Sequence, residues 1–272
     1  MAPFIRQLKE IQQTQNSLLC IGLDVDFNKI PEHLQSADNP VLEFNRQIIE
    51  ATHDLVCAYK PNLAFYEAMG DRGLTTLRET LRLIPKSVLT IGDGKRGDIG
   101  NTAERYAKSL FDDFGFDSVT VNPYMGFDSV EPFLKNSEKG VFLLALTSNP
   151  GSKDFQRLKI KGKPLYEKVV RTAKKWNTNQ NIGLVVGATH PHELKTIRKI
   201  VPEMPLLIPG IGKQGGDLKS AVRDGCDKNG QLAIINASRS IIYASSGKDF
   251  AEMARAEARR MVEEMGTYRN NI

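Results

Sequence analysis

The sequence predicts an α/β protein of the (β/α)8 TIM barrel class, with residues 1–272 forming one barrel domain. Three observations lead to this class. Short, nearly uninterrupted apolar runs recur along the chain, which is typical of parallel strands buried on both faces. Longer amphipathic segments alternate with them, as the helices of strand–helix units do. Eight such units in 272 residues fit a barrel, which commonly reaches this length as one domain.

The strands are predicted from short apolar runs that end in polar or turn residues. In chain order they cover residues 17–24, 55–60, 88–93, 117–122, 141–147, 181–187, 205–209 and 232–236. The fifth begins with the longest apolar run, 141–146, which is far shorter than the ~18 residues that a membrane span needs. We therefore expect no membrane association.

The helices are predicted from apolar residues spaced three and four positions apart. They cover residues 42–52, 74–83, 102–114, 164–176, 191–200, 218–224 and 250–265. The longest stretch without regular structure is 148–163, which contains glycine and several lysines. Loops of this length in compact domains usually serve as lids or binding loops.

The charge balance argues for a small anionic substrate rather than a nucleic acid. The net charge is +5, and the lysines and arginines are scattered instead of forming a basic stripe. A slightly positive protein suits a small anion equally well. Cys20, Cys57 and Cys226 are odd in number, far apart and without CxxC spacing. Together with an amino end that lacks a signal-peptide pattern, they indicate a reducing cytoplasm.

The most informative stretch is Asp93-Gly-Lys-Arg-Gly-Asp98, at the carboxyl end of the third predicted strand. Residues two apart in a strand point to the same side, so Asp93 and Lys95 should share a face, and Asp98 begins the turn into the next helix. Charge collects at loop edges in most proteins, and a solvated loop is the ordinary interpretation of such a pattern. The neighbouring strand ends make a functional interpretation stronger.

Polar side chains stand at the ends of several predicted strands, where the active site of a barrel forms. Asp24 ends the first strand, Lys60 the second, and Ser148 follows the fifth. Two carboxylates are costly side by side unless cations lie between them. The order Lys60, Asp93, Lys95, Asp98 could supply such an alternating network.

A glycine-rich segment, 209–217, follows the seventh strand. It formally matches GxGxxG, but the next strand ends in Ile-Asn-Ala-Ser-Arg instead of the acidic residue that a dinucleotide site requires. Loops after strands seven and eight of barrels commonly bind phosphate. Gln214, the Gly215 amide and Arg239 are the candidates here, because a guanidinium can bind phosphate through two hydrogen bonds.

The spacing of His190 and His192 invites a metal site, but no cysteine or carboxylate partner is suitably spaced. We interpret the pair as the start of a helix and expect no metal site.

With these residues in view, the chain resembles orotidine 5′-phosphate decarboxylases, most closely the longer bacterial subgroup often called type 2. The resemblance covers nearly the whole chain. It rests on several motifs: Gly22-Leu-Asp24, Tyr59-Lys-Pro-Asn62, 93–99 with Thr102-Ala103 and Tyr106-Ala107, Thr147-Ser-Asn-Pro150, 209–217 and Ser238-Arg-Ser-Ile241. DxKxxD alone is less specific, because related phosphosugar enzymes share it.

The resemblance implies a role for each candidate residue. Lys60, Asp93, Lys95 and Asp98 would form the charged catalytic network, and Lys95 would protonate C6 of the pyrimidine. The substrate-binding residues would be Asp24 with Lys60 at the ribose, Ser148 at the pyrimidine, and Gln214, Gly215 and Arg239 at the phosphate. It also implies a reaction without cofactor, and a homodimer in which Asp98 and Thr102 enter the partner's site.

Two alternatives stay open. A metal-dependent phosphosugar decarboxylase or aldolase-like enzyme of the same barrel class would need a metal-binding acid near the second or third strand end. Lys60 and Pro61 occupy that place, although Glu67 lies close by. A protein that only binds nucleotides would not need the charge network. Turnover of orotidine monophosphate, and the sensitivity of that turnover to a chelator, would distinguish these two alternatives from a metal-free decarboxylase.

Overall fold

The computed structural model describes residues 2–211, 217–270 and 272. Eight parallel strands close into a barrel in the order β1-β10-β9-β8-β5-β4-β3-β2. Their bounds are β1 Leu19–Gly22, β2 Ala58–Lys60, β3 Leu89–Arg96, β4 Ser118–Val121, β5 Gly140–Leu146, β8 Ile182–Val186, β9 Leu206–Pro209 and β10 Ala233–Ala237. Each lies within or beside one of the eight predicted runs, and the predicted (β/α)8 fold class is confirmed.

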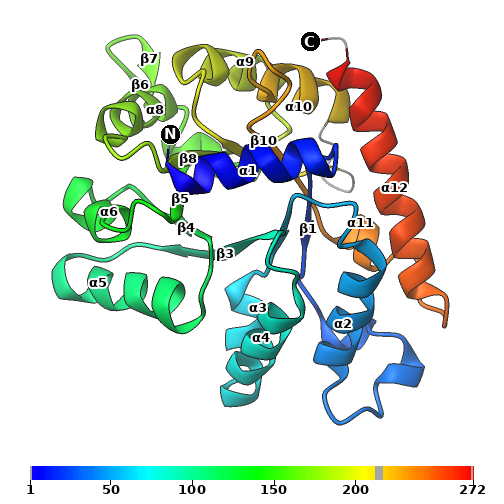
Figure 1. Ribbon diagram of the computed structural model, residues 1–272. Helices are drawn as coiled ribbons and strands as arrows, with labels where there is room; N and C mark the ends of the chain where they lie inside the picture. Colours follow the sequence, from blue (N-terminus) through cyan, green and yellow to red (C-terminus); the bar gives the residue numbers. More distant parts are fainter. Residues whose placement is uncertain (1, 212–216, 271) are drawn as a thin grey trace.

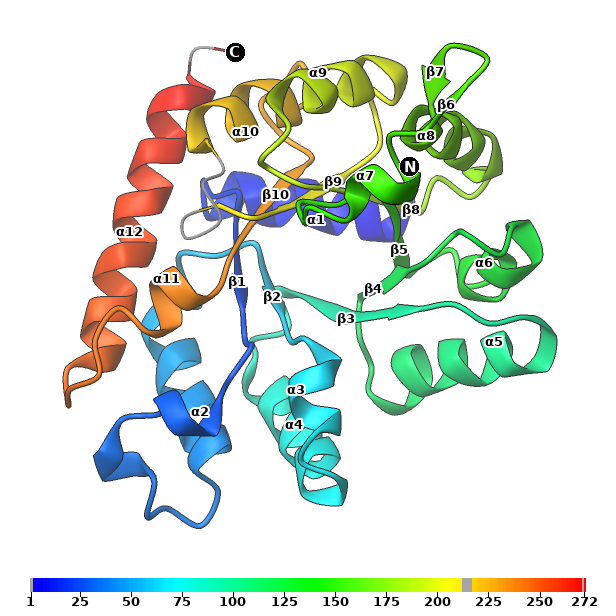
Figure 2. The same ribbon diagram turned by 180° about the vertical axis from the view of Figure 1, so that it is seen from behind.

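The helices surround the barrel (Figures 1 and 2). They are α1 Pro3–Thr14, α2 Pro40–Thr52, α3 Leu63–Glu67, α4 Asp71–Leu83, α5 Gly100–Lys108, α6 Phe127–Leu134, α7 Ser152–Phe155, α8 Leu165–Trp176, α9 Pro191–Ile200, α10 Leu218–Gly225, α11 Arg239–Ile242 and α12 Phe250–Arg269. The shorter turns are η1 Phe27–Lys29, η2 Glu32–Leu34 and η3 Ser109–Asp113, the last a π-helical continuation of α5.

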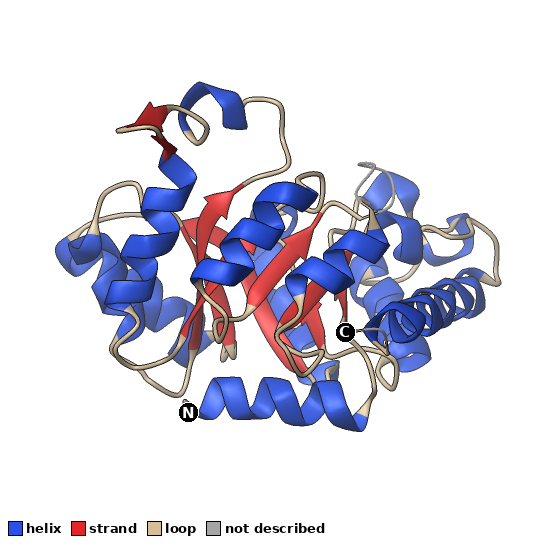
Figure 3. Cartoon of the chain, turned by 90° about the horizontal axis from the view of Figure 1, so that it is seen from above, coloured by secondary structure: helices blue, strands red, loops and turns tan. Residues whose placement is uncertain are grey.

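Some of these elements were not predicted. No helix was expected between the fourth and fifth strands, where α6 lies with Pro132 inside it. Residues 148–163 were expected to be irregular, but α7 lies there, followed by a small antiparallel hairpin formed by β6 (Lys159–Ile160) and β7 (Lys163–Pro164). The hairpin and α7 stand above the carboxyl ends of the strands (Figure 3).

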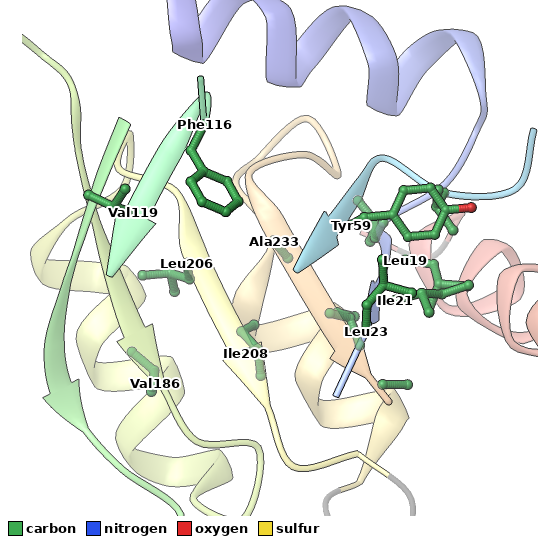
Figure 4. Close-up of a cluster of buried hydrophobic side chains, with 14 of the residues drawn as sticks. Leu19, Ile21, Leu23, Tyr59, Phe116, Val119, Val186, Leu206, Ile208 and Ala233 are labelled. Carbon is green, nitrogen blue, oxygen red and sulfur yellow. The ribbon is translucent and has the colours of Figure 1, made fainter. Parts of the chain in front are cut away.

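Alternation along the strands divides the core into two layers. Leu19 and Ile21 of β1 pack in the cluster between the barrel and its helices, as Figure 4 shows. Cys20, between them, belongs to a second cluster inside the barrel, together with Phe142 of β5. Each fully buried side chain of this size contributes roughly 1.5–3 kcal/mol, so both layers hold the strand ends in place.

Helix α1 closes the amino-terminal end of the barrel (Figure 3). Phe4 and Leu8 are buried in the inner cluster, and a Cβ at Gly140 would lie 2.5 Å from the Phe4 ring. The buried Gln12 side chain donates to the Ala233 carbonyl at 2.6 Å and accepts from the Leu232 amide at 2.9 Å. With this end covered, the barrel interior is reached from the carboxyl ends of the strands.

No helix in the described part of the chain is long and apolar enough to cross a membrane. The three cysteines are buried free thiols, and burial raises the pKa of Cys57 and of Cys226 to about 12. Their thiolate forms are therefore suppressed at neutral pH, and we assign them packing roles.

Candidate active site

A cavity of about 400 Å³ opens at the carboxyl ends of the barrel strands. The residues that line it come from all eight strands or from the segments that follow them: Asp24, Lys60, Asn62, Asp93, Lys95, Thr120, Leu144, Thr147, Ser148, Asn149, Val185, Leu207, Pro209, Gly210, Ile211, Asn236, Ser238, Arg239 and Ser240. One side is charged, and Leu144, Val185 and Leu207 supply an apolar wall. This combination suits a flat ring with charged substituents.

Asp93 is the centre of the charged side. Lys60 Nζ lies 2.7 Å from its Oδ2, and Lys95 Nζ lies 2.6 Å from its Oδ1. The hydroxyl of Thr120 also donates to Oδ1, at 2.9 Å. Asp93 is 7% exposed, so a carboxylate with three donors is held rigidly between two ammonium groups.

The fields of these groups fix their charge states. Burial alone would raise the pKa of Asp93, but the two lysines outweigh it and hold this pKa well below its ordinary range. Burial alone would lower the pKa of Lys60, but Asp24 and Asp93 hold it above its ordinary value. At neutral pH the cavity therefore carries fixed charges of alternating sign.

The backbone of β3 departs from a regular strand where it supplies Lys95. The register with β4 shifts between Gly92 and Arg96, and Lys95 has a φ of +46°, in the left-handed region. Its amide donates to the Thr120 hydroxyl at 2.9 Å. Residues other than glycine rarely adopt such a φ, and these positions concentrate at functional sites.

Asp24 lies where a substrate hydroxyl could be bound. Its Oδ1 is 3.8 Å from Lys60 Nζ, and this buried oxygen has no hydrogen-bond partner among residues 2–211 and 217–270. A buried acceptor without a donor costs free energy unless a ligand supplies one.

Ser148, which follows β5, and Arg239, which follows β10, also line the cavity. In the closed barrel, β4 lies between β5 and the β3 strand of Asp93, and β2 and β1 lie between β3 and β10. Arg239 takes part in no ion pair among those found within residues 2–211 and 217–270, so its guanidinium can bind an anion without leaving a protein carboxylate. The predicted phosphate ligands Gln214 and Gly215 lie outside the described residues.

Two predicted residues lie outside the cavity of their own chain. The carboxylate of Asp98 accepts from the Ile99 amide at 2.8 Å, and Thr102 is exposed on α5. Neither contributes to the cavity lining.

Thr120, Thr147 and Asn236 line the cavity and were not predicted as site residues. Each lies in a strand or at a strand end, so only the period-two alternation of side chains could have indicated its direction.

The acid that a metal-dependent alternative needed is engaged elsewhere. Glu67 forms an ion pair with Arg96, whose guanidinium lies 5.1 Å from the centre of the Tyr106 ring. Glu67 does not line the cavity. Among the described residues, no group of three or more histidine, cysteine or acidic side chains is placed to hold a metal.

The closed barrel, with a lysine–aspartate array and an apolar wall in the cavity at its strand ends, is typical of a barrel enzyme that acts on a small anionic molecule. The family pattern described as orotidine 5′-phosphate decarboxylase / HUMPS matches residues 17–254. The chain belongs to the orotidine 5′-phosphate decarboxylase family.

Individual relatives agree. The orotidine 5′-phosphate decarboxylase of Dehalococcoides mccartyi is 51% identical over 273 residues, with 99% of each chain covered. That of Flavobacterium johnsoniae is 52% identical, with 96% of each covered. Among solved structures, Leishmania donovani OMP decarboxylase has a TM-score of 0.86 at 38% identity, with 99% of each chain covered. Leishmania donovani UMP synthase has a TM-score of 0.89 at 39% identity, and the match covers 99% of this chain and 57% of that one.

Proposed function

We propose that the chain converts orotidine 5′-phosphate to uridine 5′-phosphate (UMP) without a metal, and that Lys95 is the group that protonates C6. As a member of its family, the chain is a carboxy-lyase of pyrimidine biosynthesis. The observation that carries the mechanistic proposal is the array of Lys60, Asp93 and Lys95 at one wall of the cavity.

The chemistry requires a fixed cation. Loss of CO2 from C6 leaves an electron pair in the plane of the pyrimidine ring, where no adjacent π system can accept it. A preorganised positive charge close to C6 stabilises this carbanion. The Lys95 side chain is 46% exposed, toward the cavity that it lines, and its ammonium is held by Asp93 at 2.6 Å. The same ammonium can then give a proton to C6, so one group supplies both effects.

The other groups hold the substrate. Lys60 and Asp24, whose Oδ1 accepts no hydrogen bond from the described part of the chain, bind the ribose hydroxyls. Ser148 binds the pyrimidine ring, whose flat faces meet the apolar wall. Arg239 binds the phosphate with Gln214 and Gly215. Binding energy from the phosphate, remote from C6, is then available to organise the reacting end.

A second copy of the chain completes the site in this proposal. Asp98 and Thr102 lie outside their own cavity, beside an exposed apolar surface. Ile99 is 54% exposed and Tyr124 80% exposed, and a Cβ at Gly97 would lie 3.6 Å from Met125, which is also exposed. A two-fold homodimer would bury this surface and place Asp98 of each chain in the site of its partner.

The three cysteines, buried as free thiols, are compatible with the reducing cytoplasm in which we propose that the enzyme works.

The test is turnover of orotidine 5′-phosphate, followed by loss of absorbance, with and without a strong chelator. We expect equal rates under both conditions. Activity that is abolished by the chelator and restored by magnesium would overturn the metal-free mechanism and favour the phosphosugar class. Binding of UMP without any turnover would identify a nucleotide-binding protein instead.

A further inference from the structure

His190, half of the HxH pair that suggested a metal site, makes two hydrogen bonds at the rim of the cavity. It precedes α9, and its Nε2 lies 3.2 Å from the carbonyl oxygen of Thr147, at the end of β5. Its Nδ1 lies 2.9 Å from Nη2 of Arg157. A carbonyl only accepts and a guanidinium only donates. We therefore assign Nε2 as the donor to the Thr147 carbonyl and Nδ1 as the acceptor from Arg157.

Arg157 is itself held by α9. Its Nη1 lies 2.6 Å from Oε1 of Glu193, in the first turn of that helix, and both side chains are partly buried. The guanidinium is thus fixed by a carboxylate on one side and directed at the imidazole on the other. These contacts join the segment after α7 to the start of α9 and orient the His190 ring.

Thr147 is held at both of its peptide groups. Its backbone amide donates to Oε1 of the Gln156 side chain at 2.8 Å, and Nε2 of the same side chain donates to the Thr147 hydroxyl at 2.9 Å. The contact from His190 is to the Thr147 carbonyl, which lies in the same peptide plane as the Ser148 amide. The orientation of this carbonyl therefore sets the direction in which the backbone enters Ser148.

The backbone of Ser148 is also confined by Gly187, the residue that follows β8. A Cβ at Gly187 would lie 2.8 Å from the Ser148 nitrogen and 2.9 Å from its Cα, so the chain passes where only glycine leaves room. Ser148 and Thr147 both line the cavity. The contacts around them thus act on the part of the wall assigned to the pyrimidine.

We propose that His190 is a positioning residue for the substrate: by orienting the Thr147–Ser148 peptide, it holds Ser148 against the pyrimidine ring. This inference rests on the proposed function, because it assumes that Ser148 meets the ring. His190 lies outside the cavity lining and does not touch the reacting atoms.

The test compares two substitutions that differ in hydrogen bonding. His190→Phe keeps a flat ring, slightly larger than the imidazole, and removes both hydrogen bonds. His190→Gln can still donate an amide N–H to Thr147 and accept from Arg157 through its carbonyl. His192→Phe is the matched control, because His192 is exposed and lies only two residues further along, in the first turn of α9. Thermal unfolding of each variant checks that it is folded.

The ligands are UMP and ribose 5-phosphate, which lacks the pyrimidine. We expect His190→Phe to weaken UMP binding about tenfold, the loss of a positioned hydrogen bond, while ribose 5-phosphate binds as to the wild type. His190→Gln should restore most of the UMP affinity, and His192→Phe should not change it. Equal losses for the two ligands, or failure of glutamine to restore UMP binding, would show that His190 is merely structural.

A double-mutant cycle tests the route through Ser148. In a Ser148→Ala background, His190→Phe should weaken UMP binding less than twofold further. If the fold-changes in UMP affinity of the two single substitutions multiply in the double variant, His190 does not act through Ser148. Wild-type turnover of orotidine 5′-phosphate is measured first on the same preparations. Its absence would defeat the proposed function, whereas normal wild-type turnover with an unaffected His190→Phe would defeat only this inference.

Discussion

Replacing Asp93 with asparagine removes the anion that separates Lys60 from Lys95. Lys60 is 4% exposed, and its other carboxylate neighbour, Asp24, lies at 3.8 Å instead of the 2.7 Å of Asp93. An amide keeps the shape of the carboxylate and the possible contact with Thr120, but it cannot neutralise a buried cation. The variant should therefore fold less stably than the wild type.

The size of the effect follows from burial. Removing one partner of a buried ion pair costs about 3–5 kcal/mol. The half-exposed Lys95 adds little, because water screens it. An unfolding entropy of about 2.1 cal/mol/K per residue gives a chain of 272 residues about 0.57 kcal/mol/K. We therefore expect Tm to fall by about 5–9 °C.

The assay is thermal unfolding at pH 7, followed by circular dichroism. Asp54→Asn is the matched control, because Asp54 pairs with Arg255 at 2.6 Å on the surface, where both side chains are at least one-third exposed. A surface pair contributes at most about 1 kcal/mol, so the control should shift Tm by less than about 2 °C. Equal shifts for the two variants, or no loss for Asp93→Asn, would refute the argument that burial makes this ion pair strong.

Three further outcomes are expected. First, the pKa of Asp93 is depressed in the folded state, so the stabilisation from its carboxylate is present above about pH 4 and is lost as the pH falls further. The difference in Tm between wild type and Asp93→Asn should therefore narrow at pH 3, and a constant difference would contradict the charge assignment. Arg239→Ala should lower kcat/KM for the nucleotide about 10- to 150-fold, the equivalent of roughly 1.5–3 kcal/mol, and far less for orotidine; equal losses would make Arg239 structural. Inactive Lys95→Ala and Asp98→Asn homodimers, once mixed, should regain about a quarter of the wild-type activity per chain, and no recovery after verified subunit exchange would refute shared sites.

The barrel could be predicted because its strands are short apolar runs whose order along the chain is the order of the fold. The failures have physical causes. Helix α6 contains Pro132 and is short, so the segment lacked a clear helical pattern. The hairpin of β6 and β7 pairs only two residues from each strand, and such a pairing leaves almost no signal in the sequence.

The sequence predicted which residues form the candidate site better than it predicted the geometry of that site. Asp24, Lys60, Asp93 and Lys95 stand at strand ends, and the closed barrel brings them together. The sequence could not show that Lys95 adopts a left-handed φ, because this depends on the register shift between β3 and β4.

His190 illustrates a limit of a different kind. Its partners, Thr147 and Arg157, are 43 and 33 residues away in the sequence. The histidine was correctly interpreted as preceding a helix, and nothing local indicated that its ring reaches back to β5.

The turnover of Lys95→Ala tests the central claim most directly. Lys86→Ala is its control, since Lys86 is an exposed lysine just before the amino end of the same strand, β3. UMP affinity and thermal unfolding, measured on the same preparations, show whether each variant retains a folded binding site. If Lys95 both stabilises the carbanion and protonates C6, Lys95→Ala loses at least about 10²-fold in kcat while it still binds UMP, and Lys86→Ala keeps the wild-type rate. A folded Lys95→Ala variant that keeps more than about a tenth of wild-type turnover would contradict the assignment of Lys95 as the proton donor.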